Sequence, residues 1–204
     1  MVVCARSLSR HPGSSYFRIE EIFMALADSL RTPINPADHV IGDAGAPCLV
    51  VEYGDFECPI CAQAYPAVKI MLKHFEGKVR FAFRHFPLLS AHPHAELAAE
   101  AAEAAAGQGK FWQMHDLLFE NQHNLEPDAL RRYAQQIGLD LDRFDAEMGE
   151  HIYLQRVQEH LAGGRASGVH SLPAFLVDGA LADVSFGPEH LFKVVETHLA
   201  AISQ

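Results

Sequence analysis

The chain contains no long hydrophobic run. None of its apolar stretches approaches the ~20 residues of a membrane-spanning helix, and its first 30 residues hold scattered arginines but no apolar signal core of ~7–15 residues. We therefore expect a cytoplasmic protein. A periplasmic location is the alternative if the true start is not Met1, and Met24 is a second candidate for that start.

Basic residues are also scarce. Lys and Arg together number 16 against 26 Asp and Glu, and the formal net charge is −10. Phosphate contacts need clustered Lys and Arg, and anionic membrane surfaces attract the same residues. The composition therefore argues against nucleic acid and against a membrane surface as partners.

Cysteine is too infrequent to form a disulfide framework. Cys4 lies in an N-terminal extension, and Cys48 opens an apolar run in which cysteine behaves as a small buried hydrophobe. This leaves one close pair, Cys58 and Cys61. In a reducing compartment such a pair indicates catalysis or metal binding.

Strand and helix patterns alternate around this pair. Residues 48–53 (CLVVEY) are an apolar run that predicts a strand buried on both faces. A helix is expected from about residue 59 to 75, with proline at its first position, glycine just after its end and a kink at Pro66. Residues 79–86 (VRFAFRHF) alternate and predict a second strand. Together they form a βαβ unit.

The remainder of the chain is helical and then returns to strands. Five helices are expected between residues 92 and 167. Two short strands then flank the turn Asp178-Gly179 as a hairpin, and a last helix covers about 188–201. Before the first strand, residues 31–47 are expected to form a linker with one extended piece near Val40.

The position of Cys58 at the start of a helix has a chemical consequence. Backbone N–H groups and the helix dipole stabilise a thiolate there, and such positions lower a thiol pKa from ~8.5 to about 3.5–7.5. Cys61, one turn further in, is expected to be less exposed and to attack a mixed disulfide on Cys58. Proline and isoleucine between the cysteines supply no positive charge.

The acidic residues near the pair act in different ways. Asp55 and Glu57 oppose thiolate formation if they face Cys58. Glu52 lies within the buried strand, so burial is expected to raise its pKa, and it is a candidate to exchange a proton with Cys61 through water. A locally hydrogen-bonded Glu52 without a role in proton transfer is the alternative.

A metal site and a structural pair are the alternatives to redox catalysis. A zinc site requires four ligands, usually from a second C-x-x-C or paired histidines, and no second pair exists. We interpret the histidines in the region as solvated or capping rather than catalytic; they are His85, His92, His94 and His115. Redox catalysis is therefore favoured, with no metal.

Three separated stretches together resemble DsbA-like thioredoxin-fold oxidoreductases: VEYGDFECPICAQAYP, HPHAELAAEAAEAAAGQGKFWQMHDLLFENQ and GVHSLPAFLVDG. The resemblance covers roughly residues 38–201. It implies an α/β class, with a thioredoxin fold (βαβ…ββα) interrupted by an all-helical insertion. The implied division is a loosely ordered N-terminal extension at 1–37, a thioredoxin-like domain at 38–90 and 168–204, and a helical insertion at 91–167.

The resemblance also implies roles for individual residues. Cys58 would be the nucleophile, Cys61 the resolving cysteine and Glu52 the buried acid. A cis-proline at Pro173, with Leu172 before it, would orient an extended substrate. Two further residues, Pro59 and Ile60, would complete the substrate-binding set. The chain departs from the family pattern at two positions: isoleucine stands where exported oxidases often carry histidine, and leucine precedes the cis-proline where valine or threonine is usual.

The function expected from these residues is dithiol–disulfide exchange on protein or peptide thiols, without a cofactor. The expected partners are such substrates and an unidentified redox partner, with the protein as a monomer or homodimer. A chaperone or adaptor module on the same fold is one alternative. A glutathione-dependent transferase or isomerase is another, but such relatives generally lack the second cysteine, and Cys61 is present here.

Overall fold

A computed structural model of the protein describes residues 32–184 and 187–203. Cys4, Met24 and the rest of the first 31 residues lie outside this range. The predicted βαβ unit is confirmed: β2 (Cys48–Gly54), α2 (Pro59–His74) and β3 (Val79–His85) follow one another, and the two strands pair in parallel. The helix continues through Pro66 and ends one residue before the predicted end.

Five strands form one mixed sheet, in the order β1-β3-β2-β4-β5. The extended piece expected near Val40 is β1 (His39–Ile41), which pairs antiparallel with β3 at one edge. At the other edge, β4 (Ala174–Val177) and β5 (Ala180–Ala182) form the predicted hairpin, and β4 pairs antiparallel with β2. Both turn residues, Asp178 and Gly179, have positive φ, as a tight two-residue hairpin turn requires.

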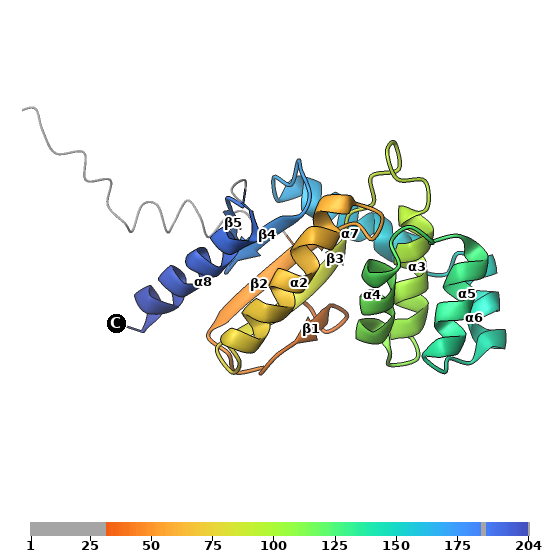
Figure 1. Ribbon diagram of the computed structural model, residues 1–204, viewed down its shortest axis with the longest axis horizontal. Coiled ribbons are helices and arrows are strands. Elements are labelled where there is room, and N and C mark those ends of the chain that lie inside the picture. The colour runs from red at the N-terminus through yellow and green to blue at the C-terminus, as the bar shows by residue number, and fades with distance from the viewer. Residues whose placement is uncertain (1–31, 185–186, 204) are drawn as a thin grey trace, which may run out of the picture.

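The predicted block of five helices stands between β3 and β4. Its members gather mainly at one side of the sheet (Figure 1) and are α3 (Ala95–Ala106), α4 (Phe111–Glu120), α5 (Pro127–Gln136), α6 (Leu141–Gly149) and α7 (Leu154–Ala166). The last helix, α8 (Pro188–Ile202), follows the hairpin. The element order is therefore the predicted βαβ…ββα fold with an all-helical insertion.

Helices cover both faces of the sheet. Val50 of β2 and Phe81 of β3 belong to the larger core, together with the buried residues of α2 and α8. On the opposite face, Val51 and Ala82 lie in a second cluster, against which Leu161 of α7 packs. The central strands are therefore apolar on both faces, as continuous hydrophobic runs predict.

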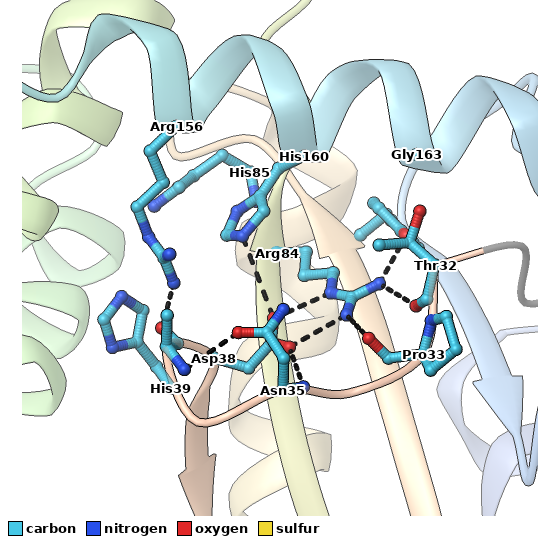
Figure 2. A network of polar contacts seen from close by, with 12 residues as sticks. Thr32, Pro33, Asn35, Asp38, His39, Arg84, His85, Arg156, His160 and Gly163 are labelled. Atoms are coloured by element: carbon cyan, nitrogen blue, oxygen red, sulfur yellow. Dashed lines mark hydrogen bonds and ion pairs between the residues drawn. The ribbon is translucent and has the colours of Figure 1, made fainter.

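The chain before β1 is fixed to the sheet by one buried arginine. The guanidinium of Arg84 pairs with both carboxylate oxygens of Asp38, at 2.8 and 2.9 Å (Figure 2). It also donates to the backbone oxygens of Thr32 and Pro33 and to the hydroxyl of Tyr53. All five donors of a guanidinium are used. Residues 32–38, which the sequence assigns almost entirely to the extension, are held in this way.

Candidate active site

Cys58 occupies the N-cap position of α2, and Pro59 is the first helical residue. Proline suits that position because its fixed φ matches the helix and its missing N–H is not needed there. The backbone N–H of Cys58 donates to the oxygen of Asp55 at 3.1 Å, which closes the turn into the helix. Cys58 is 6% exposed and Cys61 is fully buried, so Cys58 is the more accessible of the two residues.

The pKa values of the two cysteines are shifted in opposite directions. The thiol of Cys61 donates to the sulfur of Cys58, and this is the largest of the effects that lower the pKa of Cys58 to about 6. The backbone N–H groups of Ile60 and Cys61 help, while burial and the charge of Asp55 oppose. The same hydrogen bond, with burial and the charge of Glu52, raises the pKa of Cys61 far above its ordinary value. The pair therefore offers one thiolate and one thiol.

Glu52 projects from the central strand β2, as predicted. It is 2% exposed, and its Oε1 has no hydrogen-bond partner among the residues that the structure describes. Burial, and then the charge of Cys58, raises the pKa of Glu52 to about 8. Gly54 keeps this region tightly packed, because a Cβ there would lie 2.6 Å from the ring of Phe83. The expected burial and raised pKa of Glu52 are both present.

The peptide bond between Leu172 and Pro173 is cis, as the resemblance implies. These residues line a cavity of about 580 Å³ together with Ile60 and Gln63 of α2. Leu181 of β5 forms part of its wall. Residues on both sides of the helical insertion therefore meet at one open groove next to the cysteine pair. Ile60 is 53% exposed and presents an apolar side chain there.

Two histidine–carboxylate pairs near the cysteines were not predicted from the sequence. His92 Nδ1 lies 2.8 Å from Asp55 Oδ2. His94 Nδ1 lies 2.9 Å from Glu57 Oε1, and the His94 backbone N–H donates to Glu57 Oε2. The H-x-H spacing at 92–94 was the available signal, but each histidine meets a carboxylate 37 residues earlier in the chain.

The interpretation of two other histidines as solvated or capping was wrong. His85 and His115 are buried, at 1% and 5% exposure. Both contact the ring of Phe56, which lies in the loop before Cys58, and His115 also meets the ring of Phe83 edge-on. The apolar insertion closes over these rings, which a local sequence pattern does not reveal.

Cys48 takes no part in this site. It is the first residue of β2, whereas the active-site loop follows Gly54 at the other end of that strand. Cys48 is fully buried, and burial, with the charge of Asp178, raises its pKa to about 12. The prediction that Cys48 is a small buried hydrophobe is confirmed.

Comparison with known proteins agrees with this geometry. The family model described as "Thioredoxin" matches residues 34–197. BdbD from Bacillus subtilis superposes with a TM-score of 0.75 at 22% identity, covering 82% of this chain and 96% of BdbD. A thioredoxin-like oxidoreductase from Silicibacter pomeroyi DSS-3 gives a TM-score of 0.72 at 27% identity, covering 84% and 96%.

The chain is also similar to part of a protein that is named as an antiporter. Na(+)/H(+) antiporter NhaA 1 of Salinispora arenicola is 45% identical over 172 residues, which is 84% of this chain but 26% of the antiporter. The chain thus spans about a quarter of that relative's length. Among the described residues, no helix combines the length and apolarity needed to cross a membrane. The matched region carries the fold of the solved oxidoreductases, and the chain belongs to the thioredoxin family, in its DsbA-like form with a helical insertion.

Proposed function

We propose that the protein is a dithiol–disulfide oxidoreductase that acts on protein or peptide thiols through Cys58 and Cys61. The observation that carries this proposal is the hydrogen bond from the Cys61 thiol to the Cys58 sulfur at the start of α2. It lowers the pKa of Cys58 to about 6, so that most of this residue is thiolate at neutral pH. The thiolate is the nucleophilic form.

In the reducing direction, the Cys58 thiolate attacks one sulfur of a substrate disulfide. A mixed disulfide forms, the substrate S–S bond breaks, and the other substrate sulfur leaves as a thiolate that takes a proton from solvent. Cys61 then loses its proton and attacks the Cys58 sulfur, which releases the second substrate thiolate. The protein dithiol loses two electrons and the substrate disulfide gains them. Substrate oxidation is the same sequence in reverse.

Glu52 is suited to accept the proton of Cys61. The negative charge of Cys58 is one cause of the raised pKa of Glu52. This charge disappears when Cys58 enters the mixed disulfide, so the carboxylate of Glu52 forms more readily at that moment. More of Glu52 is therefore in the carboxylate form, which can accept a proton, in the step in which Cys61 must be deprotonated.

The groove beside the pair supports an extended polypeptide substrate. Leu172 precedes the cis-proline and lines this groove, and we infer that its backbone pairs with an extended chain. The exposed side chain of Ile60 and the apolar wall from Leu181 offer contacts to substrate side chains. The direct contact between Cys61 and Cys58 favours two-cysteine chemistry over glutathione transfer.

The test is insulin reduction and refolding of a reduced, disulfide-containing protein, measured for Cys58→Ser, Cys61→Ser and Cys48→Ser. We expect Cys58→Ser to be inactive, Cys61→Ser to accumulate a mixed disulfide with substrate, and Cys48→Ser to retain activity. Full activity of Cys58→Ser would refute the proposal. The alternative is a chaperone or adaptor. It would be established if the unaltered protein shows no exchange activity and the double variant Cys58→Ser, Cys61→Ser still binds client proteins.

A further inference from the structure

The pKa of Cys58 is low although acidic residues stand just before it in the sequence. Glu57 directly precedes Cys58, and Asp55, which is 2% exposed, lies two residues before Glu57. The charge of Asp55 acts against the Cys58 thiolate. Neither residue between the cysteines carries a positive charge that could offset it. A buried carboxylate next to a thiolate is costly unless a positive group compensates it.

That compensation comes from the segment between β3 and α3. His92 Nδ1 lies 2.8 Å from Asp55 Oδ2, and the backbone N–H of Leu88 donates to the same oxygen at 2.9 Å. The other oxygen of Asp55 accepts the N–H of Glu57. The carboxylate is thus held in place on every side, and His92 is the group in this set that can bring a full positive charge.

We propose that His92 is a positioning residue for Cys58, which acts through Asp55 by neutralising the buried carboxylate beside the nucleophile. This inference rests on the proposed function, because it concerns the same thiolate. The positive charge that Pro59 and Ile60 do not supply would then come from His92, in the segment that leads into the helical insertion.

The electrostatics of His92 agree with the geometry. Burial alone would lower the pKa of His92, but the hydrogen bond to Asp55 and the charges of Asp55, Cys58 and Glu57 outweigh burial and raise it. Electrostatic attraction is mutual: because the Cys58 charge favours protonated His92, protonated His92 favours the Cys58 thiolate. Two further ionisable groups lie at the cysteine pair: the Cys61 thiol of α2 bonds to Cys58, and the charge of Glu52 from β2 acts on Cys61.

His94 provides a matched comparison. It pairs with Glu57, and the hydrogen bond to Glu57 is the largest cause of its raised pKa. However, its side chain is 32% exposed against 16% for His92, and Glu57 is 19% exposed whereas Asp55 is fully buried. Solvent screens the His94 pair more strongly, so its influence on Cys58 is expected to be smaller.

The experiment follows the Cys58 thiolate directly, by its absorbance near 240 nm and by its rate of alkylation as functions of pH. The variants are His92→Gln, Asp55→Asn, their combination and the control His94→Gln. Glutamine can keep a hydrogen bond to Asp55 but carries no charge. We expect His92→Gln to move the thiolate midpoint upward by about 1 pH unit. The equilibrium constant with glutathione at pH 7 should then change about fivefold in favour of the disulfide form.

The combined variant separates action through Asp55 from other effects. In the Asp55→Asn background, adding His92→Gln should move the midpoint much less than in the unaltered protein, because only the weaker direct attraction between His92 and Cys58 is then lost. An equal upward shift in that background, no shift in His92→Gln alone, or an equal shift in His94→Gln would each overturn the proposal. These titrations follow the Cys58 thiolate and need no substrate. If the unaltered protein shows no exchange activity, the proposed function is refuted, but the role of His92 is still decided by the titrations.

A measurement on the unaltered protein covers the case in which a variant does not fold. The midpoint of His92 protonation, followed by NMR of its ring, should fall when Cys58 and Cys61 are oxidised to the disulfide, since the thiolate charge disappears. An unchanged midpoint on oxidation would contradict the inference.

Discussion

Gln122 donates a hydrogen bond of 2.7 Å from its Nε2 to the backbone oxygen of Cys58. The same nitrogen donates to the oxygen of Phe56 at 3.0 Å. Gln122 lies just after α4, so the helical insertion directly fixes the backbone of the residue that we propose as nucleophile. Together with the His92–Asp55 pair, this contact makes the insertion part of the candidate active site.

Replacing Gln122 by Ala should destabilise the loop before α2. Two partly buried backbone oxygens lose their donor, so we expect the free energy of unfolding to fall by about 1–2 kcal/mol. Urea denaturation followed by circular dichroism measures this change. The exposed Gln155, whose amide donates to Glu159 on the same helix, is the control, and Gln155→Ala should change stability by less than about 0.5 kcal/mol. Equal effects of the two substitutions would contradict the anchoring role.

The hydrogen bond from Cys61 should control the acidity of Cys58. Because it is the largest cause of the lowered pKa of Cys58, Cys61→Ala should raise the midpoint of Cys58 alkylation by about 1–2 pH units. Cys61→Ser retains a hydroxyl donor and should fall between Cys61→Ala and the unaltered protein. A Cys61→Ala midpoint that stays near pH 6 would show that the helix start alone sets this acidity.

Glu52 should give stability a characteristic pH dependence. Its pKa rises from an ordinary value of 4.5 to about 8 in the folded protein, so the folded state keeps a proton that the unfolded state loses. Stability should therefore fall as pH rises from about 4.5 to about 8 and level off above that. Glu52→Gln should remove this slope. The oxidised protein is the one to measure, because the Cys58 thiolate would otherwise add an opposite slope, with stability gained as pH rises above about 6. Without the charge of Cys58, burial alone raises the pKa of Glu52, so the slope should level off somewhat below pH 8.

Glu52→Gln should also slow the release of substrate. Without a carboxylate to accept the proton of Cys61, the lifetime of the mixed disulfide should lengthen by about tenfold or more at pH 7. Quenching the reaction with acid and separating the mixed disulfide by mass measures this lifetime. The attack by Cys58 should be far less affected, and an unchanged lifetime would assign Glu52 a purely structural role.

Arg84 should be far more important for stability than an exposed arginine. Its side chain and that of Asp38 are 1% and 0% exposed, so Arg84→Met leaves a buried carboxylate unpaired and should cost about 3–5 kcal/mol. Arg84→Met with Asp38→Asn should recover part of this loss. The half-exposed pair Arg131–Asp145 is the control, and Arg131→Met should cost less than about 1 kcal/mol. Thermal and urea unfolding give the comparison.

Local sequence pattern was sufficient for much of this structure. The strand before the cysteines is a continuous apolar run, α2 begins with Pro59, and the turn at Asp178-Gly179 sets the hairpin. These signals lie within a few residues of the features they determine. The burial of Glu52 follows from its place in the central strand, and the cis bond at Pro173 was implied by the family resemblance.

The contacts that complete the candidate site join residues that are far apart in the sequence. His92 meets Asp55 across 37 residues and Gln122 meets Cys58 across 64. Arg84 meets Asp38 across 46, and an arginine in an alternating strand would ordinarily be assigned to the solvent side. The first two pairs depend on how the insertion folds back on the sheet, and the third on how the segment before β1 packs against β3. Periodicity and spacing do not encode this arrangement in a single sequence.

The position of β4 has a consequence for synthesis of the chain. This strand lies beside β2 near the middle of the sheet, yet the entire helical insertion separates the two in sequence. On the ribosome, β2, α2 and β3 emerge long before β4 exists. Until then β2 is an open edge, with unpaired backbone groups available to other chains, and the dithiol has no groove beside it. In the function that we propose, the nascent chain therefore carries its cysteine pair before the surface that would select substrates, and the emergence of β4 and β5 completes both the sheet and that surface.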